Sequence, residues 1–223
     1  MLPKSHSRHS VKRMLSLVLP WLVVFFLVAC SKVTPDVTPK GEPAAPPPQA
    51  APSEAMAPKG RSVAMLAGGC FWGMEELLRQ VPGVIETEVG YTGGSTARPS
   101  YEDVHTGTTG HAEAVRIVYD PSVLSYRDLL IKWFFRMHDP TTKNRQGNDV
   151  GTQYRSAIFV ASEEQRRTAE AVIEELNKSG KLSGPIVTTI EQAGPFTPAE
   201  GYHQDYLQKN PGGYTCHYLR DWT

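Results

Sequence analysis

The chain has 223 residues, of which 23 are Lys or Arg and 23 are Asp or Glu, so its formal net charge is zero. This length can bury the core of one sizeable domain, and the balanced charge argues against a strongly basic nucleic-acid-binding protein. Three cysteines are too few for a disulfide-rich scaffold or a four-cysteine zinc site. The 18 prolines are unevenly spread, since they cluster between Pro35 and Pro58, and this indicates a segmented chain.

Residues 1–29 have the pattern of an export signal. Basic residues without any acid precede an uncharged apolar run over 14–29, which is short compared with the roughly 20 residues of a spanning helix. The run ends in Leu-Val-Ala-Cys30, which resembles the lipobox of bacterial lipoproteins. That resemblance implies cleavage before Cys30 and lipid attachment to its thiol, and thus a membrane anchor facing the periplasm. An uncleaved anchor with an incidental cysteine is the alternative.

Residues 30–60 are rich in Pro and Ala and have little with which to build a core, so we expect an extended tether. Ser31 stands where some bacteria place the aspartate of inner-membrane retention, which favours the outer membrane. Without residues 1–29 the chain has 19 basic and 23 acidic residues, a net charge of −4. Residues 61–223 are therefore predicted to form a mildly acidic soluble domain.

Within 61–223, strand and helix patterns mostly alternate, which predicts a mixed α/β or α+β sheet domain. The predicted strands are 62–67, 84–91, 113–119, 154–161 and 186–191. Helices are predicted over 71–80, from Ser125, from a capping box at Ser162 and Gln165, and from a cap at 197–200. Residues 92–110 read as a long loop, and a loop of that length in a compact domain is usually functional.

Cys70 follows Gly68-Gly69 at the predicted strand-to-helix turn. A cysteine at a helix N-terminus meets free N–H groups and the positive end of the helix dipole, which favours the thiolate. Adjacent Phe71 and Trp72 could wall a small apolar pocket. This pattern favours a reactive thiol over the alternative, a buried core cysteine beside two core aromatics.

The sequence around Cys70 resembles the active-site motif of the A-type peptide methionine sulfoxide reductases. The matching blocks occur in the family's order over residues 62–216: Gly69-Cys70-Phe71-Trp72-Gly73, Gly90-Tyr91-Thr92-Gly93-Gly94, Gly110-His111-Ala112-Glu113-Ala114, His138-Asp139-Pro140, Gln146-Gly147-Asn148-Asp149, Gly151-Thr152-Gln153-Tyr154-Arg155-Ser156, His203-Gln204 and Asn210-Pro211. The resemblance implies an α+β fold with a mixed sheet, a two-layer α/β sandwich related to the ferredoxin-like folds. It also implies reduction of the S epimer of methionine sulfoxide, free or in proteins.

The chemistry requires a proton donor for the sulfoxide oxygen. Alternation along 113–119 places Glu113 on one face with Val115, Ile117 and Tyr119, where an apolar surrounding would raise its pKa. We therefore predict that Glu113 is the general acid, as the resemblance also implies; a surface carboxylate at a strand end is the alternative.

The resemblance further implies that Tyr101, Asp149 and Tyr154 line the substrate pocket, with Phe71 and Trp72 around the methyl group. Asp149 could equally cap a turn. His111 and His138 are interpreted as structural hydrogen-bonding residues.

Attack by Cys70 would leave a sulfenic acid, which condenses with a second thiol. Cys216 is the remaining candidate in the domain, and the preceding Pro211-Gly212-Gly213 would give the tail freedom to approach. Many relatives carry two cysteines in this tail, whereas this chain has only Cys216, which favours a direct step between Cys70 and Cys216. A permanent structural disulfide is the alternative. We expect a thioredoxin-like protein to reduce the product.

Two other classes of function compete with this prediction. A cysteine hydrolase or acyltransferase would pair Cys70 with His111, and a lipoprotein without enzymatic activity would use neither. The sequence carries neither a nucleotide-binding fingerprint nor a paired metal-ligand spacing, so we expect no cofactor and no metal. We expect a monomer that binds no nucleic acid.

Overall fold

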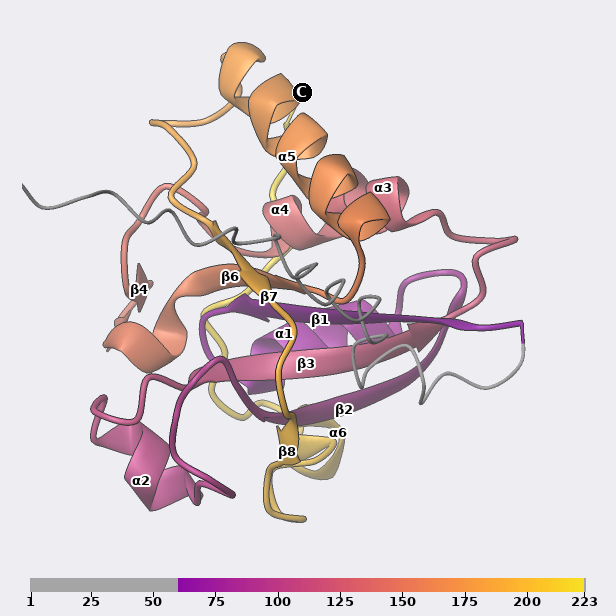
Figure 1. Ribbon diagram of the computed structural model, residues 1–223. Coiled ribbons are helices and arrows are strands. Elements are labelled where there is room, and N and C mark those ends of the chain that lie inside the picture. Colours follow the sequence, from indigo (N-terminus) through magenta and orange to yellow (C-terminus); the bar gives the residue numbers. More distant parts are fainter. Residues whose placement is uncertain (1–59, 223) are drawn as a thin grey trace, which may run out of the picture. The chain divides into compact units, whose positions relative to one another are not determined.

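The computed structural model describes residues 60–222 (Figure 1). The predicted signal, the lipidated Cys30 and almost all of the tether lie outside the described residues. Within them, a six-stranded mixed sheet has the order β7-β6-β1-β3-β2-β8. The strands are β1 (Ser62–Gly68), β2 (Val84–Thr92), β3 (Ala112–Tyr119), β6 (Ser156–Val160), β7 (Thr189–Gln192) and β8 (Thr197–Pro198). All neighbouring pairs are antiparallel except β6 with β7.

The helices of the described residues pack mainly on one face of this sheet, and α1 passes behind β1 and β3 in Figure 1. They are α1 (Phe71–Arg79), α2 (Tyr101–His105), α3 (Tyr126–Asp128), the π-helix η1 (Leu129–Phe134), α4 (Phe135–Met137), the 3-10 helix η2 (Thr152–Tyr154), α5 (Glu163–Lys178) and α6 (Tyr206–Lys209). A separate two-stranded sheet consists of β4 (Arg145–Gln146) and β5 (Asp149–Val150). The domain is therefore a two-layer sandwich with a mixed sheet, as predicted.

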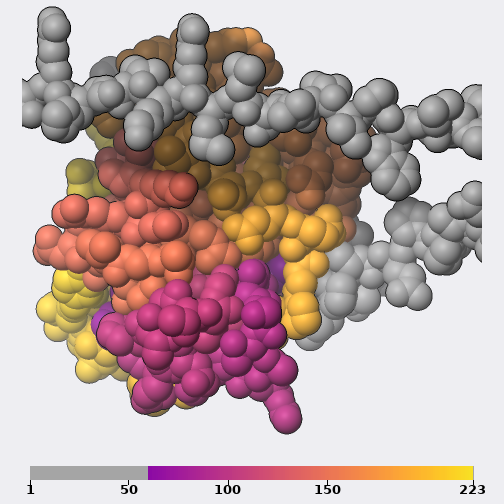
Figure 2. Space-filling model, turned by 60° about the vertical axis from the view of Figure 1, so that its left-hand side comes forward, coloured from indigo at the N-terminus to yellow at the C-terminus, as the bar shows by residue number. Residues whose placement is uncertain are grey.

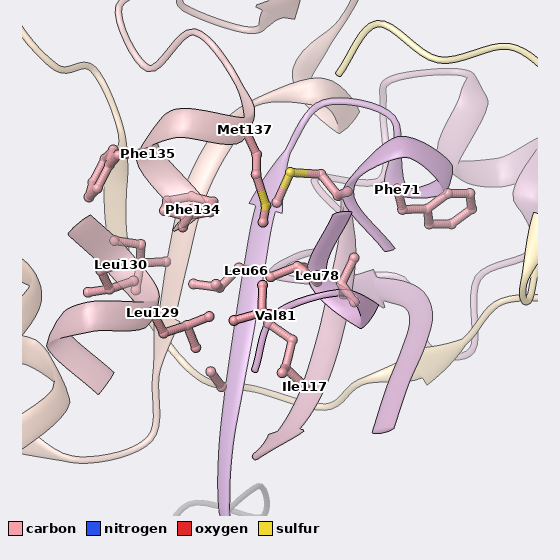
Figure 3. Close-up of a cluster of buried hydrophobic side chains, with 14 of the residues drawn as sticks. Leu66, Phe71, Leu78, Val81, Ile117, Leu129, Leu130, Phe134, Phe135 and Met137 are labelled. Atoms are coloured by element: carbon pink, nitrogen blue, oxygen red, sulfur yellow. The ribbon is translucent and has the colours of Figure 1, made fainter. Parts of the chain in front are cut away.

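Strand alternation divides the core into two clusters. Ala64 and Leu66 face the helices, whereas Met65 and Ala67 face a smaller cluster on the other side of the sheet. The larger cluster joins the sheet to α1, α5 and the helical stretch 126–137 (Figure 3). Its labelled members are Leu66, Phe71, Leu78, Val81, Ile117, Leu129, Leu130, Phe134, Phe135 and Met137. Burying each such side chain contributes roughly 1.5–3 kcal/mol to the free energy of folding. The larger cluster, between the sheet and its helices, therefore provides most of the hydrophobic stabilisation of the domain.

Several predicted elements differ from the structure. The helix predicted from Ser125 forms, but its middle, Leu129–Phe134, has π-helical hydrogen bonding. The strand predicted over 186–191 begins only at Thr189, because the Ile186 and Val187 N–H groups donate to Asn177 Oδ1 and the Pro140 carbonyl.

The helix cap predicted at 197–200 is wrong. Thr197 and Pro198 form β8, which pairs with Gly90 and Tyr91 of β2, and α6 begins later, at Tyr206.

The other differences lie at element ends. Tyr154 belongs to η2, so β6 starts at Ser156, two residues later than the predicted start of this strand. Ser162 Oγ accepts from the Gln165 N–H as predicted, but Gln165 Oε1 accepts from Ala161 rather than closing a box on Ser162.

The long polar stretch 92–110 contains one short helix, α2, which begins with a capping box between Ser100 and Asp103. The polar stretch packs beside the segment that follows β5, because Thr152 Oγ1 in that segment donates a hydrogen bond to the Gly107 carbonyl at 3.0 Å. Figure 2 shows these two segments side by side on one face of the domain. The loop therefore has a fixed place next to the elements that carry Asp149 and Tyr154.

Candidate active site

Cys70 lies at the turn between β1 and α1 and is the N-cap residue of α1. Two glycines allow this turn to fit against its neighbours. Gly69 has φ +106°, and a Cβ there would lie 2.6 Å from Gln146 Cβ. Gly73, in the first turn of α1, leaves room for Thr215 and His217 of the C-terminal tail. The small size of these two glycines thus allows β4 and the C-terminal tail to approach the turn that carries Cys70.

Glu113 reaches the same helix start from β3. Its side chain is 3% exposed, and Oε2 accepts a hydrogen bond from the Phe71 N–H at 3.1 Å. Burial raises its pKa to about 8, opposed by the Phe71 hydrogen bond and reinforced by Asp149. Val115, Ile117 and Tyr119 share its face in the main core, so the predicted placement of Glu113 on an apolar face is confirmed. Its carboxyl is therefore mostly protonated at neutral pH.

The predicted preference of Cys70 for the thiolate is wrong for this resting structure. Cys70 is 6% exposed, and burial raises its pKa well above 9.0, helped by the nearby charges of Glu113 and Asp149. The Trp72 N–H, at the positive end of the helix, lowers the pKa but does not offset the burial. Helix position alone therefore does not decide the ionisation of Cys70.

The predicted pocket residues occupy different depths. Phe71 is buried in the main core, whereas Trp72 is partly exposed and stacks on Tyr206 with a centroid distance of 3.8 Å. Tyr101 starts α2, and Tyr154 ends η2. Burial raises the pKa of both phenols, and the charges of Glu113 and Cys70 add to the shift. The two hydroxyls therefore stay protonated near the cysteine and can donate hydrogen bonds.

Asp149 contacts the C-terminal tail. Its carboxylate accepts from Cys216 Sγ at 3.3 Å through Oδ2 and from the Tyr214 hydroxyl at 3.1 Å through Oδ1. Burial, together with the Asp149 hydrogen bond and charge, raises the pKa of Cys216 to about 12. Cys70 and Cys216 are both free thiols. Asp149 thus holds the second cysteine beside the site, a contact that the sequence did not indicate.

The histidines named in the sequence analysis are structural. His111 uses Nδ1 to accept from the Gly94 N–H and places Nε2 at 2.8 Å from the Thr96 carbonyl oxygen. His138 is buried between the Phe134 carbonyl and Ser156 Oγ, and its pKa is lowered by burial to about 3. His111 is therefore not free to act as a base for Cys70, which disfavours the hydrolase alternative.

Three further polar residues lie near the site and were not among the predicted site residues. His217 is buried next to Cys216, with Nε2 2.8 Å from the Gly68 carbonyl oxygen and Nδ1 3.5 Å from Cys216 Sγ. Burial lowers the pKa of His217 to about 4. His203 and Glu200 lie among the pocket aromatics. His203 belongs to a matched block, but no local pattern predicts its contacts with residues 71 and 72.

Residues 60–222 offer no group of three or more His, Cys, Asp or Glu side chains arranged for a metal ion. Among the same residues, no helix is both long and apolar enough to span a membrane. A hollow of about 500 Å³ lined by Arg61, Tyr119, Tyr126 and Ser162 contains none of the candidate site residues.

Comparison with known proteins identifies the family. Residues 62–222 match the family model described as peptide methionine sulfoxide reductase. A peptide methionine sulfoxide reductase of Nocardia farcinica is 57% identical over 160 residues, covering 71% of this chain and 91% of the relative. The reduced Mxr1 of Saccharomyces cerevisiae has 41% identity and a TM-score of 0.69, covering 74% of this chain and 94% of that one. The same yeast protein in complex with Trx2 has 29% identity and a TM-score of 0.50, covering 74% and 93%. The chain belongs to the peptide methionine sulfoxide reductase family and is an oxidoreductase.

Proposed function

We propose that Cys70 is the nucleophile that reduces the S epimer of methionine sulfoxide, with Glu113 as the general acid. The observation that carries this proposal is a buried carboxyl with a pKa of about 8, hydrogen-bonded to the first N–H of the helix that Cys70 caps. A carboxyl that is protonated at neutral pH can give its proton to the sulfoxide oxygen as the S–O bond breaks.

The reaction does not require Cys70 to be a thiolate in the resting protein. Cys70 sulfur attacks the sulfoxide sulfur while Glu113 donates a proton to the oxygen. The thiol proton passes to Glu113 and restores its acid form. The hydroxyl then moves from the methionine sulfur to Cys70 as the transient sulfur–sulfur bond breaks, which leaves a sulfenic acid and methionine. The high pKa of Cys70 fits this sequence, because proton loss and attack are coupled through one carboxyl.

The phenols of Tyr101 and Tyr154 are proposed to donate hydrogen bonds to the sulfoxide oxygen. Their raised pKa values keep them protonated over the working pH range. Phe71 and Trp72 would contact the methyl group and set the preference for one epimer by shape. Trp72 would form one wall of this site, and its indole stacks on Tyr206.

Cys216 is proposed to resolve the sulfenic acid. Its sulfur attacks Cys70 sulfur, the hydroxyl leaves as water, and a Cys70–Cys216 disulfide remains. A thiol with a pKa of about 12 needs a proton acceptor for this attack, and Asp149 already accepts its S–H hydrogen bond. A thioredoxin-like dithiol would then reduce the disulfide, as the yeast relative's complex with Trx2 suggests.

The location of the protein is a separate proposal. The basic head, short apolar run and Cys30 box support lipidation, and residues 30–60 would tether the domain to the periplasmic side of a membrane, with the outer membrane favoured. Oxidised exported proteins would then be its substrates. Intact-mass analysis of the membrane fraction tests this: a chain starting at Cys30 with acyl groups supports it, and an unmodified full-length chain contradicts it.

The activity is tested by following each epimer of methionine sulfoxide separately, with dithiothreitol as reductant. Wild type should consume only the S epimer, and Cys70→Ser should consume neither. An ester or amide substrate offered in parallel should remain intact. Unchanged S-epimer reduction by Cys70→Ser would contradict the assignment of the nucleophile.

A further inference from the structure

His203 lies at the centre of the aromatic residues around Cys70. It is 2% exposed, and its ring centroid is 5.2 Å from Phe71, 5.5 Å from Trp72 and 4.7 Å from Tyr101. One imidazole thus contacts three of the residues proposed to bind substrate, although it belongs to the turn that precedes α6. None of the steps proposed above uses it.

The hydrogen bonds of His203 fix its tautomer. Trp72 Nε1 lies 3.0 Å from His203 Nδ1, and an indole nitrogen can only donate. His203 Nδ1 must therefore carry the lone pair, and the ring proton sits on Nε2. Burial lowers the pKa of His203, which keeps the ring neutral. A protonated ring would carry hydrogen on both nitrogens and would lose the bond to Trp72.

Glu200 faces the other ring nitrogen. His203 Nε2 is buried without a hydrogen-bond partner, and Glu200 Oε2 lies 3.9 Å from it. The Glu200 carboxylate also accepts from the Tyr91 hydroxyl and from the Tyr101 N–H, each at 2.9 Å. The carboxylate beside His203 is therefore fixed to the sheet and to the start of α2, so the imidazole has a rigid surrounding.

Trp72 is held on its face and at its edge by different residues. Tyr206 stacks on the indole plane with 13° between the rings, which leaves rotation within that plane unrestricted. The bond to His203 Nδ1 removes this freedom, because it fixes the direction of the indole N–H. Trp72 is partly exposed in the first turn of α1, so packing alone would allow other rotamers.

We propose that His203 is a positioning residue, whose neutral Nδ1 holds the Trp72 indole in the orientation that forms one wall of the methyl-binding site. The inference rests on the proposed role of Trp72 in binding substrate. Since Trp72 does not touch the reacting oxygen in that proposal, loss of the hydrogen bond should weaken binding and epimer discrimination and should leave the chemical step nearly unchanged.

Two variants of His203 separate the hydrogen bond from the packing. His203→Phe keeps an aromatic ring against Phe71 and Tyr101 but removes the acceptor. His203→Asn is the conservative rescue, because its amide oxygen can lie near the position of Nδ1. His105→Phe is the matched control: His105 also contacts Tyr101, at 5.4 Å between ring centroids, but it is exposed and is not the partner of the Trp72 indole.

Steady-state kinetics with both epimers give the first readout. His203→Phe should raise KM for the S epimer about fivefold with kcat changed less than twofold, since about fivefold is what one net hydrogen bond corresponds to. His203→Asn should recover most of the loss, and His105→Phe should match wild type. A drop in kcat with unchanged KM, or equal loss in His203→Asn and His203→Phe, would overturn the proposal.

A second readout needs neither activity nor a variant of His203. Long-range nitrogen–proton NMR spectra of the wild type, with Trp72→Phe used to assign the indole signal, report which imidazole nitrogen carries the proton. We expect the proton on Nε2 and a slowly exchanging Trp72 N–H; a proton on Nδ1 would overturn the proposal. If the wild type reduced neither epimer, the proposed function would fail while this spectrum still tested the contact.

Discussion

Replacing Glu113 by Gln tests the protonated carboxyl on which the proposed chemistry depends. The amide is nearly isosteric, and its oxygen can still accept the Phe71 N–H that Glu113 binds at 3.1 Å. The variant should therefore fold with the same turn at Cys70. It lacks an acidic proton, so kcat/KM for methionine S-sulfoxide should fall by about 10²- to 10⁴-fold, the usual contribution of a positioned general acid.

The same substitution has a calculable effect on stability. The folded pKa of Glu113 is about 8 against an ordinary 4.5, so between these values the folded protein keeps a proton that the unfolded chain has released. Wild-type stability therefore falls as pH rises through this window, by about 5 kcal/mol in total at 1.36 kcal/mol per pH unit. The loss is complete above pH 8. Glu113→Gln does not titrate, so its stability relative to wild type should rise by that amount over the window.

Urea unfolding of both proteins at several pH values between about 5 and 9 measures this difference. Glu86→Gln, which removes an exposed carboxylate of β2, is the matched control and should follow wild type. Parallel stability curves for wild type and Glu113→Gln would refute the reasoning, because they would mean that Glu113 is not held protonated in the fold. Full activity of the variant would refute its role as the acid.

Three further predictions follow from the geometry of the turn and the tail. Alkylation of Cys70 by iodoacetamide, measured on its peptide by mass spectrometry, should be slow at neutral pH and rise only above pH 9, since its pKa is raised above 9.0; fast labelling at neutral pH would contradict this. Asp149→Asn should leave the first methionine product unchanged but slow disulfide formation by about 10²-fold, seen as Cys70 sulfenic acid trapped by dimedone, because Cys216 loses its proton acceptor. Gly69→Ala should lower the free energy of unfolding by about 2 kcal/mol, since its φ is +106° and its Cβ would meet Gln146, whereas Gly194→Ala, which meets open space, should be nearly neutral.

Much of the fold follows from local pattern. Strands β1, β2 and β3 and helix α1 lie within one or two residues of the predicted ranges, and α5 begins after the predicted cap residue Ser162. These elements are predictable because their apolar periodicity directly reflects which face is buried. Strand β8 was missed because two residues carry no periodicity, and its pairing with β2 depends on residues more than 100 positions away. Helix α2 was missed because its five residues carry no apolar periodicity inside a long polar stretch.

The features of the candidate site also divide into those that local sequence patterns predict and those that depend on tertiary packing. Alternation along β3 predicts that Glu113 lies on the same face as Val115, Ile117 and Tyr119, and this is the face that packs in the larger core cluster, since a strand's side-chain period is two. The ionisation of Cys70 was mispredicted, because the helix terminus is a local effect, whereas the burial and the Glu113 charge that outweigh it come from tertiary packing. The contact of Asp149 with Cys216, 67 positions apart in sequence, likewise depends on the path of the tail.

A single-turnover experiment without added reductant tests the central claim most directly. Fully reduced protein is mixed with excess methionine S-sulfoxide, and the methionine formed and the state of each cysteine are measured together. Wild type should form one methionine per chain and a Cys70–Cys216 disulfide. Cys216→Ser should form the same methionine and retain one oxygen atom on Cys70, and Cys70→Ser should form none. Methionine formed by Cys70→Ser, or a disulfide that excludes Cys70, would contradict the account.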